Sequence, residues 1–187
     1  VARGISAVDK MAVIARNSHG CAVIRFAIAR IGAVLVPINF MLNANEVRYI
    51  LNSSRSKMLA LGPEFIDIGL EAISKGTDIE ITLGLPSEHQ SSSLKTDLRF
   101  EGLLTGDATA PEIHLDDRSL AQIVYTSGTE AMPKGAMLSH SAVLWQYTSC
   151  IIDGEMTGLQ VTLCCTLFHY IIAHSSTYFL VQLSILA

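Results

Sequence analysis

Three serine and threonine side chains, two glycines and one lysine lie close together in residues 125–135. The stretch reads Tyr-Thr-Ser-Gly-Thr-Glu-Ala-Met-Pro-Lys-Gly and follows a run of apolar and β-branched residues that predicts a strand. Glycines let a backbone approach a ligand closely, hydroxyls donate hydrogen bonds, and a lysine supplies a positive point charge. These are the groups that a polyphosphate requires. The sequence therefore predicts a phosphate-binding loop after a strand.

The common nucleotide-binding pattern G-x-x-x-x-G-K-[ST] does not fit this loop. Counted from Gly128, the pattern requires a second glycine where Pro133 stands and a hydroxyl where Gly135 stands. Proline has no N–H group to donate to a phosphate. The loop is therefore of another phosphate-binding class, and the alternative interpretation is an ordinary polar turn.

The chain around the loop alternates between short apolar runs and helical patterns. We expect strands at residues 11–15, 33–38, 57–61, 79–83 and 120–125. We expect helices at residues 19–31, 43–51, 65–73 and 139–152. Asn43 and Glu46 resemble a capping box, and Gly32 occupies a helix stop position. The alternation predicts an α/β fold, a parallel sheet with helices on both faces, whereas residues 86–117 are expected to form an irregular loop.

Composition excludes several function classes. The 187 residues are 50% hydrophobic and 16% charged, which favours a buried core over disorder. A net charge of −4 offers no basic face, so we expect no nucleic acid as a partner. No export signal is recognisable at the front, and a cytoplasmic location is expected. The cysteines show no C-x-x-C spacing and are expected to be buried free thiols.

Residues 156–187 contain no Asp, Glu, Lys or Arg. The segment is long enough to span a bilayer, but polar residues such as Gln160, Thr162 and His174 interrupt it. We therefore favour an interior strand and helix over a membrane segment. If part of this apolar segment is exposed on the surface, we expect it to promote self-association of the chain.

The loop resembles the signature of the adenylate-forming superfamily, which includes acyl-CoA synthetases, luciferases and peptide-synthetase adenylation domains. That signature is roughly Y-T-S-G-[ST]-[TE]-[GA]-x-P-K-G-[VA], and nearly every position of 125–136 fits it. The pair Glu130-Ala131 resembles the fatty-acyl-CoA synthetase branch. Further likenesses to the family's core segments occur at residues 12–18, 32–39, 43–51 and 138–140. Residues 166–169 resemble the family's P-L-[FY]-H segment, with Thr166 in place of the proline.

The resemblance implies an ATP-dependent ligase that joins a carboxylic acid, in this branch a fatty acid, to coenzyme A. The carboxylate would attack the α-phosphorus of ATP to give an acyl-adenylate and pyrophosphate, and coenzyme A would then take the acyl group. The residues implied to line the ATP phosphates are Thr126, Ser127, Gly128, Thr129, Glu130 and Lys134. Thr129 would also contribute to Mg²⁺ binding, and His169 would lie beside the acyl carboxylate. Glu130 is alternatively a solvated loop charge, and His169 a hydrogen-bonded core residue.

The same resemblance implies a domain organisation. Residues 1–187 correspond to the N-terminal part of an adenylation domain, without its Y-G-x-[TS]-E segment, its ribose-binding aspartate and its C-terminal lid domain. We therefore expect little catalytic activity from this chain alone. The alternative is a non-catalytic domain of the same fold that serves in binding or assembly, or that associates with a membrane through the uncharged residues 156–187.

Overall fold

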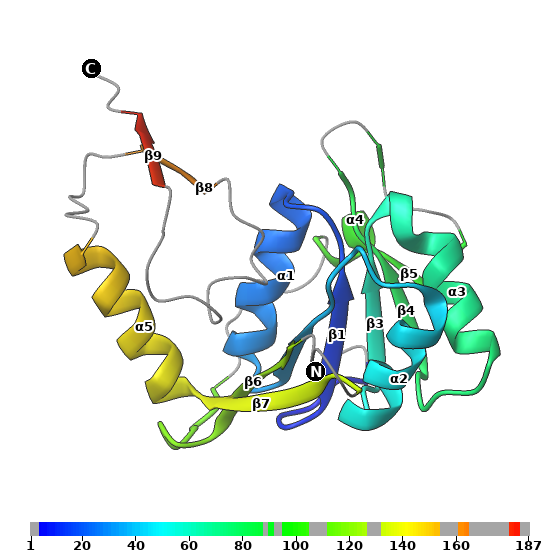
Figure 1. Ribbon diagram of the computed structural model, residues 1–187, viewed down its shortest axis with the longest axis horizontal. Coiled ribbons are helices and arrows are strands. Elements are labelled where there is room, and N and C mark those ends of the chain that lie inside the picture. Colours follow the sequence, from blue (N-terminus) through cyan, green and yellow to red (C-terminus); the bar gives the residue numbers. More distant parts are fainter. Residues whose placement is uncertain are drawn as a thin grey trace.

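The computed structural model describes residues 4–87, 90–91, 95–104, 112–126, 132–153, 161–164 and 180–183. The strands are β1 (Lys10–Ile14), β2 (Val34–Pro37), β3 (Met58–Leu61), β4 (Ile81–Gly84), β5 (Leu98–Arg99), β6 (Leu120–Thr126), β7 (Lys134–Ser139), β8 (Val161–Cys164) and β9 (Leu180–Leu183). The helices are α1 (His19–Arg30), α2 (Ala44–Ser54), α3 (Ile66–Ser74), α4 (Phe100–Leu103) and α5 (His140–Asp153), with a short 3₁₀ helix at Pro63–Phe65. Figure 1 shows their arrangement.

Seven of the described strands form one sheet in the order β5-β4-β3-β1-β2-β6-β7. Every neighbouring pair is parallel except β6 and β7, which form an antiparallel hairpin. At the centre, Ala12 of β1 lies opposite Val36 of β2 and Leu59 of β3. β8 and β9 form a separate antiparallel pair. The predicted α/β fold with a mainly parallel sheet is thus confirmed.

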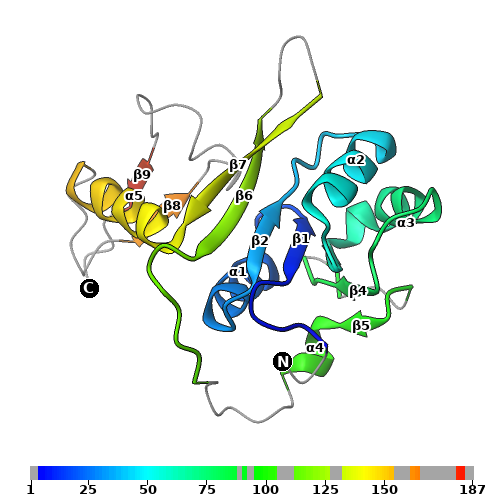
Figure 2. The same cartoon turned by 90° about the horizontal axis from the view of Figure 1, so that it is seen from below.

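Helices cover both faces of the sheet, as Figure 2 shows. Ala12 and Ile14 of β1 belong to the core beneath α2 and α3, whereas Met11 and Val13 belong to the core beneath α1. All four side chains are buried. A central strand covered on both faces has no polar face, which explains why the sequence of β1 is an unbroken apolar run.

The helix termini confirm the sequence signals. Asn43 Oδ1 accepts hydrogen bonds from the N–H groups of Asn45 and Glu46 at 3.0 and 3.2 Å, and Glu46 Oε2 accepts from the Asn43 N–H at 2.8 Å. This is the predicted capping box of α2. Gly32, just after α1, has φ of +69°, a backbone conformation that glycine adopts without steric cost.

Two predictions about loops are wrong. Residues 86–117 contain β5 and α4, and the stretch after the fifth predicted strand contains β7. β5 has only two residues, too few for a periodicity to appear. β7 is an exposed strand at the end of the sheet order, so it lacks the apolar alternation of a half-buried strand.

Cys21 is free and buried, as expected for this thiol. No helix in the described ranges combines the length and apolar character needed to cross a membrane. Most of the uncharged segment 156–187, on which the membrane alternative depends, lies outside the described residues.

Asp97, the residue before β5, forms hydrogen bonds with Thr82 of β4. Its Oδ2 accepts hydrogen bonds from the N–H and the hydroxyl of Thr82 at 2.8 and 2.7 Å, and its own N–H donates to Thr82 Oγ1 at 2.9 Å. The side-chain and backbone hydrogen bonds from Thr82 hold the pKa of Asp97 below its usual range. The charged form is therefore the one that the folded chain prefers.

We expect Asp97→Asn to reduce the free energy of unfolding near neutral pH by less than about 1 kcal/mol, because this carboxylate is solvent-exposed. A folded-state pKa below the unfolded one gives stabilisation above about pH 4 that is lost as the pH falls through the lower value. Urea titrations from pH 2 to pH 7 would measure this, with wild type and variant converging at the acid end. Asp78→Asn, the same charge change at another exposed position, is the control. A pH-independent difference would contradict the role of the carboxylate.

Candidate functional site

Thr126 and Lys134 face each other across the β6–β7 hairpin. Thr126 is the last residue of β6, Lys134 is the first residue of β7, and the two are direct partners in the antiparallel register. Directly opposed residues project from the same face of a hairpin, with Cβ atoms about 5 Å apart. Both residues are exposed. The hairpin therefore presents a hydroxyl and an ammonium side by side next to the predicted loop.

Of the predicted site residues, these two are the ones that the structure brings together. Ser127, Gly128, Thr129 and Glu130, together with Ala131, lie between the two strand ends and outside the described residues. His169 also lies outside them. Their assignments remain predictions.

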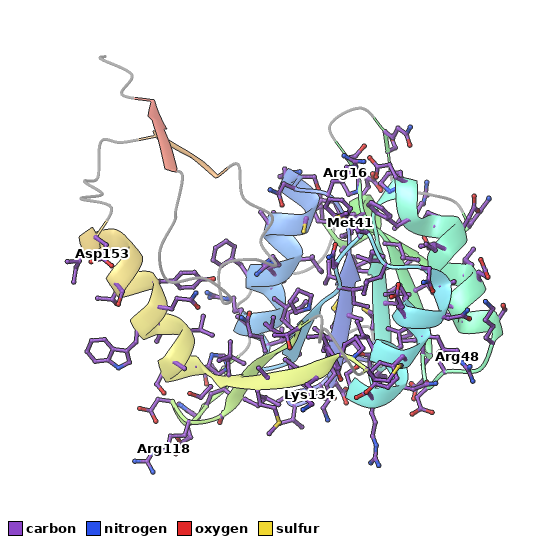
Figure 3. All side chains as sticks on the ribbon, in the orientation of Figure 1. Arg16, Met41, Arg48, Arg118, Lys134 and Asp153 are labelled. Carbon is purple, nitrogen blue, oxygen red and sulfur yellow. The ribbon has the colours of Figure 1, made fainter. Side chains whose placement is uncertain are left out.

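Lys134 offers a charge that no described acidic side chain neutralises. The ion pairs of the described residues involve Lys57, Lys75 and Lys95, not Lys134. In Figure 3, Arg16 lies toward the upper side of the domain and Lys134 toward its lower side. Within the described part of the hairpin, Lys134 alone supplies positive charge beside Thr126.

Tyr125 fixes the same end of the hairpin from the other face. Its ring packs against the core beneath α2 and α3, and its hydroxyl donates to Ser53 Oγ at 2.9 Å. Ser53 lies in the last turn of α2. Successive residues of a strand point to opposite faces, so Tyr125 and Thr126 project in opposite directions. Tyr125 thus ties the strand to the body of the domain without occupying the face of Thr126 and Lys134.

Gly135 packs closely against Ile123 and Tyr125. Gly135 is the register partner of Tyr125, and a Cβ at this position would lie 3.0 Å from Tyr125 Cζ and 2.8 Å from Ile123 Cγ2. A side chain here would force the two strands to shift. Gly135, the residue after Lys134, therefore has a packing role in addition to letting the backbone approach a ligand.

Metal-ligating side chains and the Cys21 thiol are the other groups to consider as a site. They contain no cluster of three or more His, Cys, Asp or Glu side chains suited to a metal ion. Burial raises the pKa of the Cys21 thiol, although Arg25 partly opposes the shift. Cys21 is therefore protonated near neutral pH and is a poor nucleophile.

An apolar cavity of about 320 Å³ lies between α1 and α5. Phe26 of α1, Gln122 of β6 and Tyr147 of α5 contribute to its wall, as does His140 at the start of α5. His140 Nε2 is buried and has no hydrogen-bond partner among the described residues. The cavity is a separate feature from the hairpin end that carries Lys134.

The side chains at the hairpin end are of the types that bind anions in proteins. A hydroxyl and an unneutralised ammonium, fixed on two paired strands, suit phosphate oxygens. A Mg²⁺ ion would need oxygen ligands, and the Thr126 hydroxyl is the one that the β6–β7 register places directly opposite Lys134. Sequence reasoning missed Ser53, because 72 residues separate it from Tyr125 and no local spacing connects them.

Comparison with known proteins shows that the chain is similar to AMP-binding enzymes and to CoA ligases. The family model described as "AMP-binding enzyme" matches residues 1–184. The 4-hydroxybutyrate–CoA ligase 2 of Metallosphaera sedula is 29% identical over 160 residues, covering 82% of this chain and 29% of that protein. The long-chain-fatty-acid–CoA ligase FadD13 of Mycobacterium tuberculosis is 32% identical over 142 residues, covering 76% of this chain and 27% of that protein.

A solved structure shows the same arrangement. The inhibitor-bound N-terminal domain of FACL13 from Mycobacterium tuberculosis matches with a TM-score of 0.65 and 29% identity, covering 79% of this chain and 36% of that one. The chain spans about a third of the length of the curated relatives it matches.

Proposed function

The chain belongs to the family of AMP-binding enzymes, and on that premise we propose that it forms the ATP-phosphate-binding part of a carboxylate–CoA ligase. The proposed reaction is attack of a carboxylate on the α-phosphorus of ATP, which forms an acyl-adenylate and releases pyrophosphate. Transfer of the acyl group to coenzyme A would follow. Ligase names among the relatives support this reaction class.

The observation that carries the proposal is the Thr126–Lys134 pair at the base of a hydroxyl- and glycine-rich segment. The pair holds a donor and a positive charge in a fixed relation on the same hairpin face. Such groups would orient the triphosphate and offset the negative charge that gathers on the leaving pyrophosphate. Ser127, Gly128, Thr129 and Glu130 would complete the contacts to the phosphates.

Mg²⁺ and the acid require residues outside the described part of the chain. When bound, Mg²⁺ would neutralise charge on the phosphate oxygens, and we propose Thr129 as a contributor to its binding. We propose His169 as the residue beside the acyl carboxylate. A fatty acid is the proposed substrate, supported by the Glu130-Ala131 pair and by the name of the Mycobacterium tuberculosis relative.

Carboxylate-dependent exchange of labelled pyrophosphate into ATP tests the proposal. The assay should use the product of the complete reading frame, with short, medium and long carboxylates. Exchange that requires both the acid and Mg²⁺ is the expected result, with a preference for longer chains. A folded protein that is inactive with every chain length would contradict it, and would favour the non-catalytic binding domain. The 187-residue chain alone is expected to show little exchange.

We also propose that this chain self-associates through apolar side chains on α1 and α5. Phe26 is 74% exposed and Trp145 is 71% exposed. Exposed apolar surface of this kind favours protein–protein contact. Sedimentation velocity at increasing protein concentration would show the association, and a constant monomer would contradict it.

The cytoplasm, where ATP and coenzyme A are available together, is the proposed location.

A further inference from the structure

The end of the β6–β7 hairpin needs support that the sheet does not give. β7 is the last strand in the sheet order, and β6 is its partner among the described strands. Residues 134–137 of β7 are exposed, so little packing holds the start of this strand. Figure 2 shows the paired strands extending alongside α2. The positions of Thr126 and Lys134 therefore depend on what attaches the hairpin to α2.

Tyr125 makes that attachment. Its hydroxyl reaches Ser53 Oγ at 2.9 Å, and its ring packs against the α2–α3 core and lies beside Gly135. One aromatic side chain thus contacts α2, the neighbouring strand and the core at the same time. The position of α2 is itself well defined, because Val47, Ile50 and Leu51 are fully buried.

We propose that Tyr125 and Ser53 are positioning residues that hold Thr126 and Lys134 in the geometry required by a triphosphate. The inference rests on the proposed function of the hairpin. Tyr125 acts through the backbone, because its side chain lies on the face opposite to Thr126 and Lys134. Tyr125 and Ser53 meet on the other face of the hairpin from Thr126 and Lys134, and we assign them no contact with the triphosphate.

The test compares Tyr125→Phe and Ser53→Ala, each of which removes one partner of the hydrogen bond and little else. We expect the backbone amides of 134–139 to exchange hydrogen three- to tenfold faster in both variants, with the amides of 10–14 unchanged. The dissociation constant for magnesium tripolyphosphate should rise by the same factor. The two effects should not add in the double variant, because either change breaks the same bond. Ser53→Thr, which keeps a hydroxyl, should restore both readouts.

Tyr147→Phe is the matched control, since it removes a tyrosine hydroxyl from α5 and should change neither readout. Unchanged exchange in Tyr125→Phe and Ser53→Ala would overturn the attachment. Faster exchange with unchanged tripolyphosphate affinity would overturn the positioning role and leave the attachment intact. If the wild-type chain does not bind tripolyphosphate, the phosphate-binding function fails and the positioning role fails with it, whereas the exchange result still decides whether the hydrogen bond holds the hairpin.

Discussion

Replacing Lys134 with alanine is expected to lower kcat/KM for carboxylate-dependent pyrophosphate exchange by about 10²-fold. Lys134 is the unneutralised charge of the described hairpin, and its position beside Thr126 is set by the register of two strands. Removal of one donor that is already aimed at developing negative charge costs about this much. The exchange assay measures the rate, and calorimetric titration with magnesium tripolyphosphate measures the phosphate contact without any contribution from adenine.

Lys75→Ala provides the control for the Lys134 experiment. Lys75 pairs with Glu71 on the surface of α3, so its removal changes the net charge equally but leaves the hairpin unchanged. We expect Lys75→Ala to remain within twofold of wild type, and Lys134→Arg to retain part of the activity because it keeps the charge. Equal effects of Lys134→Ala and Lys75→Ala would mean that net charge, and not the placed ammonium, governs binding.

Gly135→Ala is expected to destabilise the chain by about 1–3 kcal/mol and to impair phosphate binding as well. The added methyl would lie 2.8 Å from Ile123 Cγ2 and 3.0 Å from Tyr125 Cζ, closer than packed carbon atoms approach. Neither neighbour is the free end of a flexible side chain, so the strands themselves must separate. Urea denaturation reports the stability, and tripolyphosphate titration reports the site.

Gly102→Ala is the matched glycine control. A Cβ at Gly102 meets nothing within 4 Å, and its helical position in α4 gives alanine a small advantage. The steric account also predicts coupling: Ile123→Ala removes the nearer methyl and should reduce the cost of Gly135→Ala in the double variant. The steric explanation would be contradicted if the stability losses of Ile123→Ala and Gly135→Ala were additive in the double variant. It would also be contradicted if Gly102→Ala and Gly135→Ala had equal effects.

Much of the fold could be predicted because its signals are local. The capping box at Asn43 and Glu46 and the stop at Gly32 lie within one turn of the elements they bound. The four parallel strands β1 to β4 are apolar runs because helices cover them. β7 could not be predicted in this way, since its pairing depends on backbone hydrogen bonds to β6 and its side chains are largely exposed.

In the candidate site, too, the local features could be predicted from the sequence and the long-range contacts could not. The residue types predicted a phosphate-binding loop, the resemblance to the family signature implied Thr126 and Lys134 within it, and the structure pairs these two residues. The hydrogen bond from Tyr125 to Ser53 joins residues 72 positions apart, so only the folded chain reveals it. The glycine at 135 was predicted as a means of backbone approach, and the structure adds a second requirement, the Ile123 methyl and the Tyr125 ring beside it.

The strand order has a consequence for synthesis of the chain on the ribosome. β1, at the centre, finds both of its neighbours within the first 61 residues, so a nascent chain can assemble β1, β2 and β3 early. β6 joins this nucleus through the pairing of Gln122 with Leu35, a contact that is non-local in sequence and therefore slow to form. We expect the hairpin with Thr126 and Lys134 to dock after the nucleus has folded. A translation product that stops before β6 would then carry a formed α/β centre and no phosphate contacts.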